Sequence, residues 1–226
     1  MLRHLLGASA TADSMLEAIV RDARETGGKT GRPVFSDAVM EAMRTVPRAA
    51  FVPEMEKPFA YENRPLPIGH GQTISQPFVV ALMAELLDVE PGARILEVGT
   101  GCGYQTAVLC ALGATVYSVE VIELLATTAA ARLEALGYGQ ATARAGDGHA
   151  GWPEEAPFDG IIVTAAATSV PPALVAQLKP GGCLVIPVGR VAKTQHLQRI
   201  EKRVDGSSEA KTVLPVAFVP LTRGQA

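Results

Sequence analysis

Short apolar runs alternate with segments of helical periodicity through the middle of the chain. Residues 93–98 are mostly apolar and lie between Pro91-Gly92 and Gly99, which is typical of a central strand in a parallel sheet. Further strands are predicted at residues 114–119, 141–145, 158–164 and 183–188. Helices are predicted between them at residues 76–87, 104–112, 122–136 and 171–178.

Strands and helices that alternate in this way predict an α/β fold with a doubly wound, mostly parallel sheet. Towards the C-terminus, residues 195–202 and 214–219 alternate apolar and polar positions and resemble the two arms of an antiparallel hairpin. We therefore expect the parallel sheet to carry this hairpin at one edge.

The N-terminal part has a different pattern. Helices are predicted at residues 12–23 and 36–43, the second with Ser36 as its N-cap. Residues 27–30 (GGKT) resemble the end of a phosphate-binding loop, but Ala23 stands where that motif needs its first glycine, so we expect a plain loop. Residues 51–77 are rich in proline and glycine, show no clear elements, and contain aromatic residues that favour an ordered, functional connection.

This pattern divides the chain into an N-terminal helical region with a substrate and cofactor lid (residues 1–75) and an α/β core (residues 76–226), together forming one globular unit. The 226 residues, 48% hydrophobic and 19% charged, are enough for one sizeable core. With a net charge of −3 and no basic cluster, nucleic acid is not an expected partner. No apolar run reaches about 18 residues, so no membrane span is expected.

The N-terminus lacks the long apolar segment of a signal peptide, so we expect a cytoplasmic protein, and we expect a monomer. Cys102, Cys110 and Cys183 show no metal-binding spacing and are expected to be reduced and structural. No metal site is expected.

The candidate chemistry begins after the strand at 93–98. Gly99, Gly101 and Gly103 allow the backbone to approach a ligand closely. The third glycine of a dinucleotide fingerprint would fall on Tyr104 or Thr106, so that fingerprint fails. The pattern E-x-G-x-G-x-G, which starts at Glu97, fits a nucleoside without pyrophosphate better, such as the adenosine half of S-adenosylmethionine.

Two acidic residues follow the next strands, where ligands of such sheets bind. Glu120 lies about 20 positions beyond the first glycine and can accept hydrogen bonds from both ribose hydroxyls; alternatively, it starts the next helix, where an acid suits the helix dipole. Asp147, between Gly146 and Gly148, can accept a hydrogen bond from an adenine amino group; alternatively, it belongs to a plain turn.

Several motifs resemble the protein-L-isoaspartate O-methyltransferase family over residues 35–222. They are residues 71–77 (GQTISQP), 95–109 (ILEVGTGCGYQTAVL), 146–148 (GDG), 151–154 (GWPE) and 184–189 (LVIPVG), with VPLT at 219–222 as the last piece. The resemblance implies a class I, Rossmann-like, S-adenosylmethionine-dependent enzyme that methylates the α-carboxyl group of L-isoaspartyl residues in damaged proteins and peptides. A carboxyl methyltransferase of the same fold that acts on a biosynthetic peptide or a small acid is the alternative. A dinucleotide oxidoreductase or a cofactor-binding protein without catalysis is disfavoured by the failed fingerprint and by the intact Ser75 segment.

The resemblance also implies roles for individual residues. Ser75 corresponds to the active-site serine, although the alternative of an ordinary helix cap stays open, and Thr73 and Ile74 close over the cofactor. The residues implied in cofactor binding are Glu97, Gly99, Thr100, Gly101, Gly103, Glu120, Asp147 and Gly148. The acceptor carboxylate is ionised at pH 7 and needs no general base, which agrees with His70 and His149 having no evident acidic partner in the sequence. Cys102 stands where the family usually has serine, and Val121 where arginine is expected.

Overall fold

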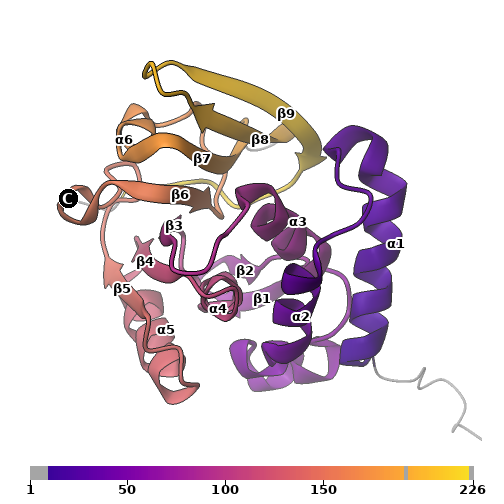
Figure 1. The fold of residues 1–226 in the computed structure, drawn as a ribbon. Coiled ribbons are helices and arrows are strands. Elements are labelled where there is room, and N and C mark those ends of the chain that lie inside the picture. Colours follow the sequence, from indigo (N-terminus) through magenta and orange to yellow (C-terminus); the bar gives the residue numbers. More distant parts are fainter. Residues whose placement is uncertain (1–9, 191–192, 224–226) are drawn as a thin grey trace, which may run out of the picture.

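A seven-stranded sheet forms the centre of the molecule in the computed structural model, which describes residues 10–190 and 193–223 (Figure 1). Its strand order is β5-β4-β3-β6-β7-β8-β9, with parallel pairing from β5 to β7 and antiparallel pairing of β8 and β9 at one edge. This confirms the predicted doubly wound sheet with a C-terminal hairpin. The strands are β3 (Arg94–Val98), β4 (Thr115–Glu120), β5 (Ala141–Ala145), β6 (Phe158–Val163), β7 (Leu178–Val188), β8 (Gln195–Lys202) and β9 (Ser208–Val216).

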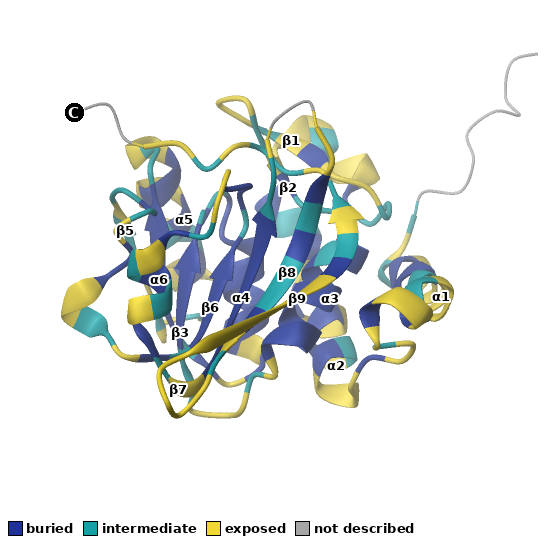
Figure 2. Ribbon diagram, turned by 90° about the horizontal axis from the view of Figure 1, so that it is seen from above, coloured by how far each residue is buried: buried dark blue, intermediate teal, exposed yellow. Residues whose placement is uncertain are grey.

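Successive side chains of the buried strands enter two different cores, one on each face of the sheet. Ile95 packs in the cluster formed with α1 to α4, whereas its neighbour Leu96 packs in the cluster that contains Leu174 of α6. Figure 2 shows the central strands buried and the tip of the β8–β9 hairpin exposed. The helices of the core are α3 (Pro77–Leu87), α4 (Tyr104–Ala111), α5 (Glu123–Ala135), α6 (Pro172–Ala176) and the 3-10 turn η3 (Pro153–Glu155).

The N-terminal part packs against α3 and α4 and shares their hydrophobic cluster. Its elements are α1 (Ala12–Thr30), α2 (Asp37–Thr45), the 3-10 turns η1 (Arg48–Phe51) and η2 (Glu54–Phe59), and a small hairpin of β1 (Leu66–Gly69) and β2 (Gln72–Ile74). Residues 51–77 therefore contain regular elements that the sequence did not predict. The elements are too short to produce a readable periodicity.

The expected loop at residues 27–30 is wrong, because α1 continues through it to Thr30. Gly27 lies against Pro33 so closely that a Cβ there would clash with the proline ring. The glycine serves packing here, and Gly31, with φ of 72°, ends the helix in the left-handed conformation. Ser36 caps α2 as predicted, with its hydroxyl accepting from the Val39 N–H at 3.3 Å.

Two further boundaries differ from the prediction. Residues 178–182, expected to close a helix, already belong to β7, and the second arm of the hairpin begins at Ser208 instead of residue 214. The first half of β9 is exposed along its whole length, so no alternation of apolar and polar residues marks it.

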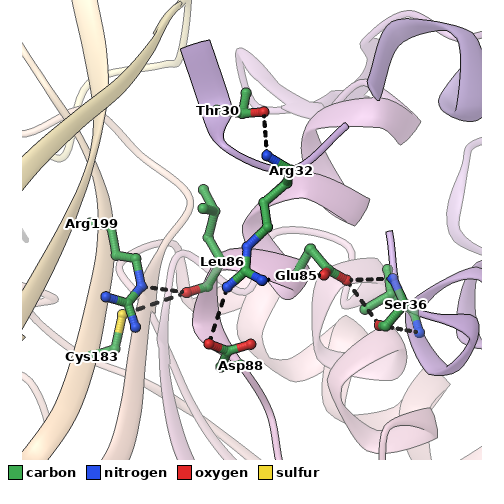
Figure 3. Close-up of polar contacts among 9 residues, drawn as sticks. Thr30, Arg32, Ser36, Glu85, Leu86, Asp88, Cys183 and Arg199 are labelled. Carbon is green, nitrogen blue, oxygen red and sulfur yellow. Dashed lines mark hydrogen bonds and ion pairs between the residues drawn. The ribbon is translucent and has the colours of Figure 1, made fainter. Parts of the chain in front are cut away.

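Helix α3 is fixed at its C-terminal end by polar contacts from three directions (Figure 3). Glu85 accepts hydrogen bonds from the backbone N–H and the hydroxyl of Ser36, both at 2.9 Å. The Leu86 carbonyl accepts from Arg199 Nε at 2.9 Å, and Arg32 forms an ion pair with Asp88 at 3.2 Å. Because α3 begins at Pro77, two residues after Ser75, these contacts also anchor the helix that follows the candidate catalytic segment. Within the described ranges, no helix is long and apolar enough to cross a membrane.

Candidate active site

The turn that follows β3, residues 99–103 (the glycine turn), needs its glycines for two physical reasons. Gly99, Gly101 and Gly103 have φ of 97°, 54° and 89°, in the region that side chains disfavour. A Cβ on Gly99 would also clash with Thr164 Oγ1, which donates a hydrogen bond to the Gly99 carbonyl at 2.6 Å. The turn is thus pressed against the end of β6 with no room for a side chain between them.

Glu120, at the end of β4, fixes the turn from the other side. Its Oε2 accepts from the Gly101 N–H at 2.8 Å, and its Oε1 accepts from the Ile122 N–H at 3.0 Å, where α5 begins. The alternative role at the helix start is therefore present in the structure. It does not exclude ligand binding, because each carboxylate oxygen can accept a second hydrogen bond and Glu120 lines a crevice beside the turn.

This crevice lies at the carboxyl ends of the parallel strands. Its walls are the glycine turn, the ends of β3, β4 and β6, Gly148, and residues 219–222 near the C-terminus. A Cβ on Gly148 would clash with Val98 Cγ1, so Gly148 brings its backbone directly against the strand end. Glycine backbone on two sides lets a ligand come close to the strand ends, and Glu120 offers it a carboxylate, so these residues fit the nucleoside part of S-adenosylmethionine.

Five predicted cofactor residues do not line the crevice: Ile74, Glu97, Thr100, Gly103 and Asp147. Glu97 is fully buried behind the turn, where its Oε2 accepts from the hydroxyls of Thr106 and Ser118. Ser118 also shares a hydrogen bond of 2.5 Å with Thr100. Glu97 and Thr100 thus belong to one buried network that supports the turn from inside.

Burial raises the pKa of Glu97 from its ordinary 4.5 to about 7, and the hydrogen bonds from Ser118 and Thr106 oppose this shift. Among the described residues, Glu97 Oε1 has no hydrogen-bond partner. A carboxyl group that titrates near neutrality therefore lies within the protein, directly below the glycine turn. Gly103 is the N-cap of α4 and packs against Leu133.

Asp147 and His149 correct one expectation. His149 was expected to lack an acidic partner, but its Nδ1 lies 3.1 Å from Asp147 Oδ1, and its backbone N–H donates to the same oxygen at 2.9 Å. The two residues are only two positions apart, and the bend at 146–148 turns the histidine back towards the aspartate. Sequence separation alone did not reveal this pair.

A cavity of about 520 Å³ adjoins the crevice. Its walls come from Thr73, Ser75, Gln76 and the first turn of α3, from Thr164, and from residues 214–219. Thr73 and Thr164 line both the cavity and the crevice, so the two spaces share a wall. Most of the other lining side chains are apolar.

Ser75 is not a helix cap. The N-cap of α3 is Gln76, which makes no capping hydrogen bond with its side chain, and the Phe78 N–H donates to Asn63 Oδ1 at 3.0 Å instead. Ser75 lines the cavity, and its side chain is not used to cap the helix. This leaves its hydroxyl available for a ligand.

The sequence does not mark two parts of the site as binding residues. Thr164 stands at the end of a predicted strand, and residues 219–222 stand out only as a motif. Ala166 holds this segment across the strand ends, because its N–H donates to the Val219 carbonyl and its carbonyl accepts from the Leu221 N–H, both at 2.8 Å. The segment and Thr164 therefore both form part of the crevice wall.

A seven-stranded sheet of this order, with a glycine turn after β3 and an acid after β4, defines the fold of a class I S-adenosylmethionine-dependent methyltransferase. Comparison with known proteins narrows this class. The family model of protein-L-isoaspartate(D-aspartate) O-methyltransferase matches residues 25–226, and the chain belongs to this family.

Individual relatives agree. The chain is 54% identical over 208 residues to protein-L-isoaspartate O-methyltransferase 2 of Polaromonas sp., covering 92% of this chain and 99% of the relative. It is also 54% identical over 215 residues to the protein of that name from Syntrophobacter fumaroxidans, covering 95% and 87%. A crystal structure of a Plasmodium falciparum protein described as a protein-L-isoaspartate O-methyltransferase, in complex with S-adenosyl-L-homocysteine, superimposes with a TM-score of 0.77 at 26% identity, covering 94% and 99% of the two chains.

Proposed function

We propose that the protein transfers the methyl group of S-adenosylmethionine to the α-carboxyl group of L-isoaspartyl residues in damaged proteins and peptides. The observation that carries the proposal is the wall that the cavity shares with the crevice, because it supports a Ser75 that lies near the proposed cofactor site. The family to which the chain belongs supports the choice of acceptor.

The chemistry requires little from acid or base groups. A carboxylate is ionised at pH 7 and can attack directly, so His149 and Asp147 are not needed as a proton relay. S-adenosylmethionine supplies an electrophilic methyl group when bound. The protein aligns the carboxylate with that methyl group and excludes water, which supports a rate gain because the opposite charges of the two reactants cancel during transfer.

Ser75 is the candidate catalytic residue, and its hydroxyl can donate a hydrogen bond to the acceptor carboxylate. Thr73 lines both spaces, and Ile74 follows it at the end of β2; the two are proposed to close over the cofactor. Gly99, Gly101, Glu120 and Gly148 are proposed to contact the cofactor directly, with Glu120 on the ribose hydroxyls. Asp147 is proposed to reach the adenine edge, while Glu97, Thr100 and Gly103 act by holding the glycine turn.

The test is methyl transfer from labelled S-adenosylmethionine to two matched peptides, one with L-isoaspartate and one with normal L-aspartate at the same position. Methylation of the first alone is the expected result. Methylation of both would show that the enzyme does not distinguish L-isoaspartate from normal L-aspartate. Methylation of neither, with cofactor binding established by calorimetry, would favour the alternative of a biosynthetic peptide or small acid as acceptor.

We also propose a monomer in the cytoplasm that does not bind nucleic acid. The net charge of −3 supports the last point. Sedimentation of the purified protein, with and without duplex DNA, would test the monomer and the absence of nucleic-acid binding together.

A further inference from the structure

Arg48, in η1, is a charged residue in an unusual place. Its side chain is fully buried, and in the described part of the chain it forms no ion pair with a carboxylate. Instead its Nε donates to the Ala60 carbonyl at 2.8 Å and its Nη2 donates to the Ser75 carbonyl at 2.7 Å. A buried cation without a counter-ion is costly, so a purely structural role would be better served by an apolar residue.

The guanidinium joins three segments that surround the site. Ala60 follows η2, Ser75 belongs to the candidate catalytic segment, and Tyr104 is the first residue of α4, directly after the glycine turn. The Arg48 Cζ lies 4.9 Å from the centre of the Tyr104 ring, which favours the cation. Burial lowers the pKa of Arg48, and the neighbouring Tyr104 opposes this shift. An arginine nonetheless stays charged inside proteins.

The contact with the Ser75 carbonyl also fixes the next peptide N–H. The Ser75–Gln76 peptide bond is trans, so its N–H points away from the carbonyl and therefore away from Arg48. Among the described residues, the Gln76 N–H has no hydrogen-bond acceptor. Ser75 and Gln76 both line the cavity. A charged donor on the carbonyl also polarises the peptide unit and makes its N–H a stronger donor.

We propose that Arg48 is a positioning residue that holds the Ser75–Gln76 peptide so that the Ser75 hydroxyl and the Gln76 N–H together receive the acceptor carboxylate. The activity readout of this inference rests on the proposed function. Arg48 itself does not touch the acceptor, because it lies behind the peptide. Its effect reaches the reaction through the orientation of two donors.

The test compares Arg48→Lys with Arg199→Lys. Arg199 is a matched control, because its guanidinium also donates to a backbone carbonyl of α3, that of Leu86, but at the opposite end of the helix (Figure 3). Lysine keeps the charge but lacks the planar fork that reaches two carbonyls at once. We expect Arg48→Lys to lower kcat/KM for the isoaspartyl peptide about 100-fold, the size expected from a misplacement near 1 Å. Binding of S-adenosylhomocysteine should change less than about twofold, and Arg199→Lys should leave kcat/KM within about twofold, since neither contact faces the crevice.

A second readout does not depend on turnover. Hydrogen exchange of the amides of residues 73–76 and 78, in protein saturated with S-adenosylhomocysteine, should be at least about tenfold faster in Arg48→Lys than in Arg199→Lys, since the segment loses the contact with Arg48 that holds it. Equal exchange in the two variants, or a kcat/KM that falls only as far as the control, would overturn the inference. If the wild-type protein fails to methylate the isoaspartyl peptide, the proposed function is refuted. The exchange measurement then still decides whether Arg48 holds the segment, and Arg48→Gln repeats it if the lysine variant does not fold.

Discussion

The glycine turn is one continuous stretch of sequence, whereas the cavity is assembled from segments far apart in the chain. The glycine turn follows directly on β3, and a neighbouring acid, Glu120, fixes its backbone at 2.8 Å. The cavity takes its walls from residues 73–79, Thr164 and residues 214–219. The first region is determined locally, and the second depends on how distant segments are held together.

The contacts that hold the two regions differ accordingly. The glycine turn rests on a compact buried network of Glu97, Thr106, Ser118 and Thr100. The segment around Ser75 is held from outside by Arg48 and Asn63, side chains that come from the N-terminal part. Changes in the turn should therefore affect mainly cofactor binding, and changes around Ser75 mainly the transfer step. The predictions below test this division.

The largest effect is expected from Gly101→Val. At φ of 54°, a β-branched residue is strained, and its side chain would extend between the turn and Ile68 of β1. We expect the affinity for S-adenosylmethionine to fall at least about 100-fold, which is a loss of about 3 kcal/mol of binding free energy. The circular dichroism spectrum should stay that of the wild type, because the backbone strain is confined to the turn. Calorimetric titration measures the affinity.

Gly139→Ala is the matched control for this variant. Gly139 has open space around it, so an added methyl group should change neither fold nor affinity. Unchanged affinity in Gly101→Val would show that the turn does not bind the cofactor.

Ser75→Ala should lower the rate of transfer and leave cofactor affinity nearly unchanged. Loss of an oriented donor to the acceptor should lower kcat about 10- to 100-fold, somewhat less than the loss of an oxyanion-hole donor, because the backbone N–H of Gln76 remains. Cofactor affinity should stay within about twofold, since the hydroxyl faces the cavity. Steady-state kinetics with the isoaspartyl peptide, beside calorimetry, separates the two. If Ser75→Ala has the kcat of the wild type, Ser75 has no role in the transfer step.

The same division explains how much of the molecule could be predicted from sequence. The strands, the glycine turn and Glu120 were identified because their signals are local: apolar runs, glycines at alternate positions and an acid at a fixed distance. The contact of Thr164 with Gly99 joins residues 65 positions apart, and neither carries a mark of the other in the sequence. At Gly27 the local signal gave a wrong prediction, a loop at residues 27–30. In sequence, a glycine used for packing against Pro33 cannot be told from one that ends a helix.

Long-range anchors were invisible for the same reason. Arg48 precedes Ser75 by 27 positions and lies just before the stretch at 51–77 in which no elements were predicted, and Asn63 gave no sign that it would cap α3. The resemblance to a family could indicate Ser75, since motifs preserve residue identity. Motifs say nothing, however, about which distant side chains hold that residue in place.

Glu97→Gln tests the buried network by its pH dependence. The folded protein binds a proton at Glu97 up to a pH of about 7, whereas the unfolded chain releases it near 4.5. The stability of the wild type should therefore be highest, as far as this group is concerned, below pH 4.5, and should fall as the pH rises to about 7, by about 1.4 kcal/mol for each unit of the pKa shift. Glutamine does not titrate and keeps an oxygen to accept from Thr106 and Ser118.

We accordingly expect the free energy of unfolding of Glu97→Gln, relative to that of the wild type, to be higher at pH 8 than at pH 5. Urea titrations at both pH values measure this difference. Other titrating groups are common to both proteins and cancel in the comparison. A difference between the two proteins that is the same at pH 5 and pH 8 would contradict a neutral Glu97 in the folded state.

Asn63→Ala should give the smallest effect. It removes the acceptor of the Phe78 N–H at 3.0 Å and the donor to Asp22 Oδ2 at 2.7 Å, so the first turn of α3 loses its cap and α1 loses one contact with the site. Loss of a cap costs about 1 kcal/mol, measured as a lower midpoint in urea. Asn63→Asp retains an oxygen to accept from Phe78 but places a second carboxylate beside Asp22, so charge repulsion should destabilise this variant. If both variants unfold at the wild-type urea midpoint, the contacts of Asn63 do not stabilise α3. Arg48 would then be the main side chain that holds the Ser75 segment in place.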